Sequence, residues 1–227
     1  MTENKDYNLD RFDGIIKELY DKVPPITLTP EYASWITNDL NRFLIRLARY
    51  KFVAKQLHKN DSVLEIGSGS GMGSIFLSQY CKSVKGVELK DYEVDEARSL
   101  NRRNNVEFEL INFFDLPERE KYDAIVNLDV IEHLNLADGE KLVAETAMRL
   151  NPTGMLVTGT PSYYSLPHQS EVSRVAHVQC YKLDELTALI SKYYDRVLTF
   201  CMNDEIVHTG SPKMAWYYYV LAFYPKA

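Results

Sequence analysis

A short apolar stretch followed by alternating glycines constrains the fold of this chain more than any other feature. Residues 63–73 read VLEIGSGSGMG, with glycines at 67, 69, 71 and 73. Glycine is required where the backbone adopts unusual dihedral angles or approaches a ligand closely. A buried strand, a turn without side chains and then a helix form the nucleotide crevice of a doubly wound sheet. The sequence therefore predicts an α/β fold with a binding crevice at this turn.

The spacing of these glycines differs from that of dinucleotide-binding loops. Such loops carry the pattern G-x-G-x-x-G, which lets a pyrophosphate reach a helix N-terminus. Counted from Gly67 the last position is Met72, and counted from Gly69 it is Ser74. Glu65, at the end of the strand, is also unfavourable beside a pyrophosphate. The turn is better suited to a ligand that carries a positive charge.

Four segments, in order, resemble the motifs of class I S-adenosylmethionine-dependent methyltransferases, in particular the ubiquinone-pathway and other small-molecule O-methyltransferases. The E-x-G-x-G-x-G pattern from Glu65 resembles their first motif. The other segments resemble the second strand, the fourth strand with the start of the active-site loop, and the fifth strand. They are VKGVE (84–88), YDAIVNLDVIEHL (122–134) and NPTGMLVTGTPSY (151–163).

Strand-like and helix-like segments alternate after residue 61, which predicts a parallel sheet covered on both faces. The resemblance implies a Rossmann-like, doubly wound α/β fold with seven mostly parallel strands, the last one antiparallel. We expect strands near 62–67, 83–88, 106–111, 122–128, 153–160, 195–202 and 214–224, and helices near 71–81, 91–103, 138–150 and 182–193. Residues 1–60 are expected to form an N-terminal helical cap, and residues 61–227 a single compact methyltransferase domain.

The cap is expected to contain two helices. Apolar residues at helical spacing predict an amphipathic helix over 10–21, which Val23-Pro24-Pro25 ends. Thr29 is a candidate N-cap for the second helix, with Pro30 in its first turn. Apolar residues then recur at helical spacing to His58. We therefore expect one long helix between these two points.

Composition narrows the choice of partners. The 227 residues carry a net charge of −6 and no long basic run, which argues against a nucleic-acid partner. The three cysteines form no C-x-x-C pair and are expected to be reduced thiols in a cytoplasmic protein. The polar N-terminus and the lack of a long apolar run predict neither a signal peptide nor a membrane span. We expect a monomer or homodimer that acts on a small-molecule acceptor.

The resemblance also implies which residues bind the cofactor, S-adenosylmethionine. The backbone around the glycine turn would border its methionine part, Glu65 would reach its ammonium through water, and Glu88 would hold the ribose. Leu89 would pack on the adenine, and Asn127 and Leu128 would lie beneath the methyl group. The turn residues concerned are Gly67, Ser68, Gly69 and Gly71.

Two of the expected cofactor positions have structural alternatives. Asn112 and Phe113 align with the segment that binds the adenine amino group, but Asn112 could equally cap a turn and Phe113 belong to the core. Arg49 lies in a segment that resembles a helix preceding the first motif, where an arginine would meet the cofactor carboxylate. An exposed arginine on a core-facing helix is the alternative.

The D-x-x-E-H pattern of Asp129, Glu132 and His133 is the candidate catalytic group. One helical turn would cluster these side chains. Histidine titrates near neutrality, so His133 is the candidate general base and Glu132 the residue that orients it. The alternative is that His133 only packs or caps. With His177, the same three residues resemble the metal site of small-RNA 2′-O-methyltransferases, but we favour metal-free transfer and assign no metal ligand.

These residues favour O-methylation of a small molecule or a sugar-bearing metabolite. Enzymes with nitrogen acceptors often carry an Asn/Asp-Pro-Pro-Tyr/Phe loop after the fourth strand, whereas residues 127–130 of this chain read NLDV. A metal-dependent RNA 2′-O-methyltransferase is one alternative, which the negative net charge disfavours. A catalytically inactive, cofactor-binding regulatory protein is another.

Overall fold

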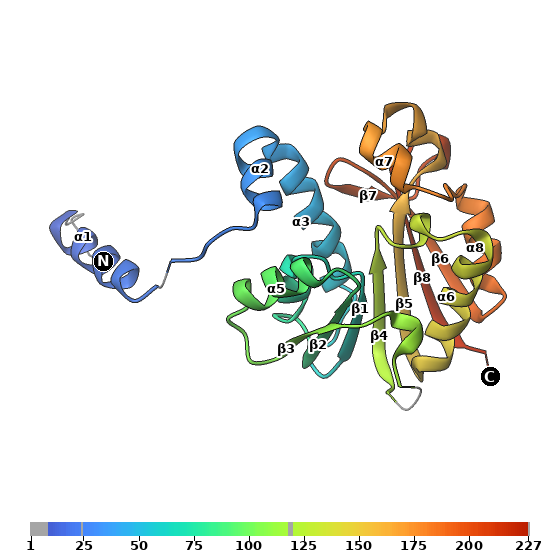
Figure 1. The fold of residues 1–227 in the computed structure, drawn as a ribbon, viewed down its shortest axis with the longest axis horizontal. Helices are drawn as coiled ribbons and strands as arrows, with labels where there is room; N and C mark the ends of the chain where they lie inside the picture. The colour runs from blue at the N-terminus through green and yellow to red at the C-terminus, as the bar shows by residue number, and fades with distance from the viewer. Residues whose placement is uncertain (1–8, 24, 118–119, 227) are drawn as a thin grey trace, which may run out of the picture.

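The computed structural model describes residues 9–23, 25–117 and 120–226. Within these residues one sheet runs through the molecule in the order β3-β2-β1-β4-β5-β8-β6-β7 (Figure 1). The strands are β1 (Ser62–Ile66), β2 (Ser83–Glu88), β3 (Val106–Leu110), β4 (Tyr122–Leu128), β5 (Leu150–Pro161), β6 (Tyr194–Asn203), β7 (Ile206–His208) and β8 (Tyr217–Pro225).

The first five strands are all paired in parallel. Strand β8 lies antiparallel between β5 and β6, so the expected Rossmann-like sheet with an antiparallel last strand is confirmed. The expected number of seven strands was wrong, because β7 adds an eighth. It has three residues and pairs antiparallel with the end of β6. So short a strand shows no alternation of apolar and polar residues from which to predict it.

Helices cover both faces of the sheet. The helices are α1 (Leu9–Asp21), α2 (Pro30–Asn38), α3 (Leu40–Ala54), α4 (Met72–Leu77), α5 (Asp91–Leu100), α6 (Leu136–Arg149), α7 (Glu171–Ala176) and α8 (Leu183–Ser191). Four 3-10 turns are η1 (Phe113–Asp115), η2 (Ile131–His133), η3 (Tyr163–His168) and η4 (Pro212–Met214). Buried residues of α3, α4 and α5 pack in one core cluster, and those of α6 and α8 pack in the other.

Side chains of the aromatic strand β8 pack into both core clusters, one on each face of the sheet. Successive side chains of a strand point to opposite faces of its sheet. Tyr217, Tyr219 and Leu221 accordingly belong to the cluster of α3, while Tyr218 and Val220 belong to the cluster of α6 and α8. The run is apolar throughout because a central strand is buried on both sides.

The single helix expected from Thr29 to His58 is in fact two helices. Thr29 caps α2 by accepting from the backbone N–H of Tyr32, as expected. The chain then bends at Asp39, where φ is −153°, and the Asp39 carboxylate caps α3 through the N–H of Arg42. The apolar spacing continues across this bend, so the periodicity gave no sign of the break.

Helix α1 has no buried residue and lies apart from the sheet, whereas α3 packs on the sheet and α2 packs on α3 (Figure 1). The proposed boundary between cap and domain at residue 60 stays a prediction. No described helix has both the length and the apolar character needed to cross a membrane.

Helix α3 approaches the glycine turn closely through Tyr50. The Tyr50 side chain is buried, and a Cβ atom at Gly73 would lie 2.1 Å from its ring. Gly73 stands in the first turn of α4, directly after the loop. The absence of a side chain at Gly73 therefore allows α3 to pack on the element that carries the loop.

We predict that Gly73→Ala lowers the free energy of unfolding by about 1–3 kcal/mol, because the added methyl overpacks this contact. Urea unfolding followed by circular dichroism measures the change. The matched control is Gly14→Ala in α1, where nothing lies within 4 Å of the added Cβ. An unchanged midpoint for Gly73→Ala would contradict the proposed packing.

Candidate active site

A cavity of about 460 Å³ opens where β4 and β5 end. Ligands of doubly wound sheets bind outside the carboxyl ends of the strands, so its position is that of an active site. One wall comes from α2 and α3, and the others from the turns after β4 and β5 and from the segment around β6–β8. Its lining residues are Trp35, Asp39, Asn41, Arg42, Ile45, Arg46, Arg49, Asp129, Glu132, His133, Pro161, Ser173, His177, Met202, Asp204, Trp216 and Tyr217.

The glycine turn after β1 is held against the end of β2. Gly67 and Gly69 have φ angles of 71° and 52°, in the left-handed region that glycine adopts without strain. The N–H groups of Gly67 and Ser68 donate to the carbonyl of Val87, at 2.9 and 3.2 Å. The N–H of Gly69 donates to the Glu88 carboxylate at 3.1 Å. The glycine turn, which has few side chains, thus lies next to the Glu88 carboxylate. This is the arrangement that a nucleoside site requires.

Three buried polar atoms near this loop have no hydrogen-bond partner within the described residues. They are the Ser68 hydroxyl, one carboxylate oxygen of Glu65 and the side-chain oxygen of Asn127. Buried polar atoms are nearly always hydrogen-bonded in folded proteins. The three residues come from the loop, from β1 and from β4, at the same edge of the sheet. A polar ligand at this edge would supply the missing partners, so the site fits a polar cofactor.

Glu65 is more buried than its expected contact through water would suggest. Only 1% of the residue is exposed, and the Ser74 hydroxyl donates to its carboxylate. Burial disfavours the charged form and raises the pKa of Glu65 to about 7, despite the hydrogen bond from Ser74. Glu65, the penultimate residue of β1, thus acts in the structure as a buried acceptor for the first turn of α4.

The residues expected at the ribose and adenine differ in how they are placed. The Glu88 carboxylate also accepts from the N–H groups of Leu89 and Lys90, at 2.8 and 3.2 Å. Leu89 is 66% exposed, at the surface beside it. Asn112 accepts from the N–H of Phe114 at 3.0 Å and caps η1, and Phe113 is buried in the core. These are the structural alternatives considered for Asn112 and Phe113.

Asp129 joins the end of β4 to helix α3. Nη1 of Arg49 contacts both carboxylate oxygens of Asp129, at 3.0 and 2.8 Å. The guanidinium also lies 3.8 Å from the centroid of the Tyr217 ring, a cation–π contact. Asp129 has a φ of 58°, which is uncommon for a residue other than glycine and is typical of functional sites. Arg49, expected near a cofactor carboxylate, is thus bound to Asp129.

Glu132 is fully buried in the turn after Asp129. The Thr160 hydroxyl donates to one of its oxygens at 2.9 Å, and the other has no partner in the part of the chain described. Burial raises the pKa of Glu132 to about 8, and the nearby charge of Asp129 acts in the same direction. A carboxyl of this kind can hold a proton near neutral pH or ligate a cation.

His133 and His177 each present a free ring nitrogen. Nδ1 of His133 lies 2.9 Å from the carbonyl of Ala176, which can only accept, so Nδ1 carries the proton. The same reasoning assigns the proton of His177 to Nδ1, which lies 2.9 Å from the side-chain oxygen of Gln169. In the neutral form of each imidazole, Nε2 then carries the lone pair. The orienting contact expected from Glu132 to His133 is therefore made by Ala176.

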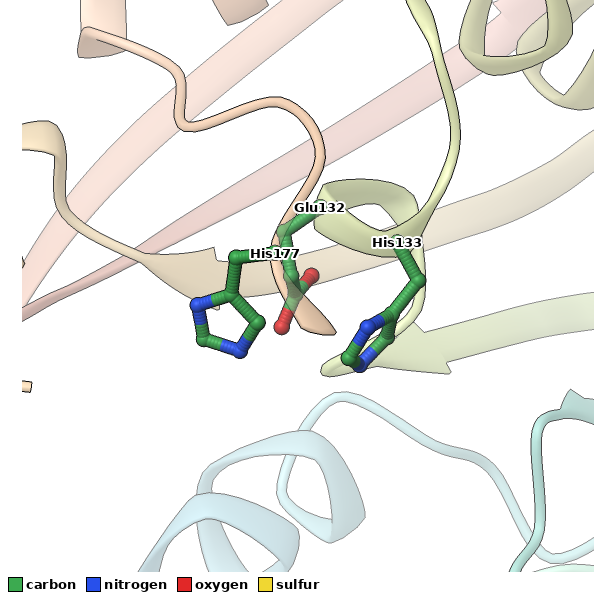
Figure 2. Close-up of side chains that lie close together, drawn as sticks. All are labelled: Glu132, His133 and His177. Carbon is green, nitrogen blue, oxygen red and sulfur yellow. The ribbon is translucent and has the colours of Figure 1, made fainter. Parts of the chain in front are cut away.

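Glu132, His133 and His177 converge, although His177 is distant in the sequence (Figure 2). One potential ligand atom from each lies within 4.8 Å of the others. The two imidazole rings meet edge to face, with centroids 5.1 Å apart. Burial lowers the pKa of His177, and the charge of His133 adds to this effect. Asp129, the fourth residue of the sequence pattern, lies outside this group.

Comparisons with known proteins place this site in a family. Residues 64–158 match the sequence family described as a methyltransferase domain. These residues run from β1 through the glycine turn and η2 into β5. They are a class I S-adenosylmethionine-dependent methyltransferase domain. For these residues, the methyltransferase domain and the cofactor class expected from the sequence are confirmed.

The curated proteins to which the chain is similar differ in their named acceptors. It is 25% identical over 104 residues to a ubiquinone biosynthesis O-methyltransferase of Pelagibacter ubique, covering 45% of this chain and 42% of that one. It is 31% identical over 106 residues to a phosphoethanolamine N-methyltransferase of Plasmodium falciparum, covering 45% and 40%. The chain thus spans about two fifths of the length of these relatives.

A solved structure shares the fold over a longer stretch. A Thermotoga maritima protein, described as an S-adenosylmethionine-dependent methyltransferase and possible histamine N-methyltransferase, superposes with a TM-score of 0.67. The identity is 18%, over 85% of this chain and 94% of that one. At this identity the likeness shows the Rossmann-like fold alone.

Several residues of the methyltransferase cavity were missed in the sequence analysis. Trp35, Arg42 and Arg46 line it from α2 and α3, and Trp216 and Tyr217 line it near β8. The spacing of the arginines at 42, 46 and 49 places them on one helical face, so the sequence could have predicted this cluster. No local pattern places Trp216 or Tyr217 at the cavity, because they reach it only through the pairing of β8 with β5.

We predict that Glu65→Gln removes a pH dependence from the stability of the methyltransferase. The folded pKa of about 7 exceeds the ordinary value of 4.5. The wild type therefore loses stability as pH rises from 4.5 towards 7, by up to about 3 kcal/mol at 1.36 kcal/mol per pKa unit. Glutamine does not titrate.

The free energy of unfolding, measured in urea at pH 5 and pH 8, tests this prediction. The difference between Glu65→Gln and wild type should become more positive at pH 8 by about 2–3 kcal/mol. The exposed Glu107 provides the control, Glu107→Gln, whose difference should stay constant. A constant difference for Glu65→Gln as well would refute the raised pKa.

Proposed function

We propose that this methyltransferase transfers a methyl group from S-adenosylmethionine to an oxygen atom of a small hydroxylated acceptor, as a cytoplasmic enzyme. The observation that carries the proposal is the position of His133. Its Nε2 lone pair is fixed by the bond from Nδ1 to Ala176, and His133 lines the cavity at the end of β4. A fixed base beside the cavity suits an acceptor whose proton must leave.

The glycine turn and Glu88 would hold the cofactor. Its ribose hydroxyls can donate to Glu88, whose carboxylate has acceptor capacity beyond the N–H groups it already receives. The buried side-chain oxygens of Ser68 and Asn127 have no hydrogen-bond partner within the described residues, so they could bind the cofactor. The cofactor would supply a methyl group already activated on a sulfonium, so the protein mainly has to align the reacting atoms.

In this mechanism His133 accepts the proton of the acceptor hydroxyl. The Ala176 carbonyl keeps Nδ1 protonated and aims Nε2 into the cavity. The ion pair of Arg49 with Asp129 fixes the end of β4 beside it. An N-methyltransferase would need no such base for an amine that is already neutral, and the loop at 127–130 lacks the two prolines typical of many amine methyltransferases.

A second candidate is metal-assisted transfer, which the convergence of Glu132, His133 and His177 favours. Metal-bound imidazoles usually donate their other nitrogen to a carbonyl or carboxylate, and both imidazoles here donate Nδ1 to an oxygen. A divalent ion would lower the pKa of a bound acceptor hydroxyl. An RNA 2′-O-methyltransferase would use the same cluster, but the net charge of −6 weighs against that acceptor.

We predict that Glu88→Ala weakens the binding of S-adenosylhomocysteine by about 1–3 kcal/mol, because the ribose hydroxyls lose their acceptor. Isothermal titration calorimetry measures the affinity. The exposed Glu107, on the neighbouring strand β3, gives the matched control Glu107→Ala, which should bind as the wild type does. Equal affinity of Glu88→Ala and wild type would remove Glu88 from the cofactor site. A wild type that does not bind would contradict the proposed function itself.

The roles of the two histidines can be separated by mutation and chelation. If His133 is a metal-free base, His133→Ala should lower turnover by about 10²–10⁴-fold, and His177→Ala and EDTA should change it little. If a metal assists, both variants should lose activity together and EDTA should abolish it, with recovery on Mg²⁺ or Mn²⁺. Transfer of a labelled methyl group to phenols, catechols and sugars is the assay.

His58 provides the control for these variants, since it does not line the cavity. Cofactor affinity should be near that of the wild type in all of them. Full turnover of His133→Ala would eliminate both versions of the mechanism. Unchanged cofactor binding with no detectable role for any of these residues would favour the alternative of an inactive, cofactor-binding regulatory protein.

A further inference from the structure

Helix α3 places three arginines in a row along the cavity. Arg42, Arg46 and Arg49 are four and three residues apart, which sets them on one helical face, and all three line the cavity. Like charges at this spacing repel and destabilise a helix. Such a row is therefore expected where another charge, from the protein or from a ligand, compensates it.

The protein compensates these three arginines to different degrees. Nη1 of Arg49 donates to both carboxylate oxygens of Asp129. Arg46 reaches Asp129 only at 3.9 Å, beyond hydrogen-bonding distance. The structure gives the guanidinium of Arg42 no hydrogen bond or ion pair within the described residues. Two guanidiniums at the cavity thus retain their donors for another partner.

Trp35 holds these two guanidiniums in place. The guanidinium carbons of Arg42 and Arg46 lie 5.4 and 5.3 Å from the centroid of the Trp35 ring. Trp35 itself is buried and packs edge to face on Tyr32, with centroids 5.6 Å apart. A cation held over an aromatic ring is already partly ordered, so it loses less conformational freedom when it binds a ligand.

Most acidic side chains at the cavity are already engaged. Asp39 caps α3, and Asp129 is bound by Arg49. Glu132 accepts from Thr160. Asp204 comes from the turn between β6 and β7 rather than from α3. Asp129 and Glu31 partly offset the charge of Arg46. Arg42 is therefore the guanidinium of this wall that has neither an ion pair nor a hydrogen bond within the described residues.

We propose that the acceptor carries a phosphate or carboxylate group, which Arg42 and Arg46 bind on the Trp35 platform. This inference rests on the proposed methyl transfer and names the class of its substrate. Guanidinium groups match the geometry of both anions with two donors. With its anion on this wall, the acceptor would extend along the same cavity towards Asp129 and His133.

The competing source of such an anion is the carboxylate of the cofactor. The two sources differ in a simple way, because a cofactor carboxylate would fill the arginine wall whenever the cofactor product is bound. An acceptor anion would bind in addition to it. Binding to the protein already saturated with S-adenosylhomocysteine therefore distinguishes them.

The experiment titrates phenyl phosphate into the full chain saturated with S-adenosylhomocysteine, at constant ionic strength, and follows tryptophan fluorescence. Both tryptophans, Trp35 and Trp216, line the cavity, and Trp216→Phe leaves Trp35 as the sole reporter. We expect saturable binding, weakened at least five-fold by Arg42→Gln. The control Arg103→Gln changes the same charge at an exposed residue outside the cavity and should bind as the wild type does.

Each outcome has a separate meaning. Loss of phenyl phosphate binding in Arg42→Gln, with S-adenosylhomocysteine affinity unchanged, supports an acceptor anion on this wall. Binding only in the absence of S-adenosylhomocysteine assigns the wall to the cofactor and overturns the proposal. No saturable binding, or equal binding by Arg42→Gln and Arg103→Gln, overturns it as well. Failure to bind S-adenosylhomocysteine would instead overturn the proposed methyl transfer.

Discussion

The ion pair of Arg49 with Asp129, in which Nη1 contacts both carboxylate oxygens, is the interaction on which the rest of the site depends. It joins the helices that precede the sheet to the end of the central strand β4. The Tyr217 ring beneath the guanidinium adds a third element, the antiparallel strand β8. A partly buried arginine pair of this kind is strong in geometry and costly to break. It fixes the relative positions of the two walls that enclose the cavity.

The backbone of Asp129 shows what this contact must stabilise. Its φ of 58° is an unfavourable conformation for a residue with a side chain. The N–H of Asp129 donates to the carbonyl of Gly159 on β5, at 2.9 Å. The turn redirects the chain so that Glu132 is buried and His133 faces the cavity. Local strain and a chemically useful arrangement of side chains thus occur together.

The two parts of the cavity have different electrostatic characters. On the side of β4, a buried carboxyl whose pKa is raised by burial lies beside two imidazoles whose Nδ1 atoms face acceptor oxygens. On the side of α3, the guanidiniums of Arg42 and Arg46 lie over Trp35. Their N–H donors make no hydrogen bond within the described residues. The first arrangement is suited to accepting a proton or binding a cation, and the second is suited to binding an anion. An acceptor with a hydroxyl at one end and an anionic group at the other would match both.

The sequence by itself determined the class of fold and the position of the cofactor loop. Motifs such as the glycine turn and the D-x-x-E-H pattern are contiguous, and parallel strands bring their carboxyl ends to one edge whatever their exact order. The order of the motifs was therefore enough to predict that Glu65, Glu88 and His133 follow strands whose carboxyl ends lie at one edge of the sheet.

Tertiary structure alone decided the remaining features. The break at Asp39, the short strand β7 and the pairing of Arg49 with Asp129 left no periodic signal. His177 and Tyr217 reach the cavity from segments about 45 and 90 residues after His133 and Asp129. Long-range packing determines such contacts. The local sequence around each of these residues does not indicate which distant residue it contacts. The burial that raises the pKa of Glu132 likewise exists only once both faces of the sheet are covered.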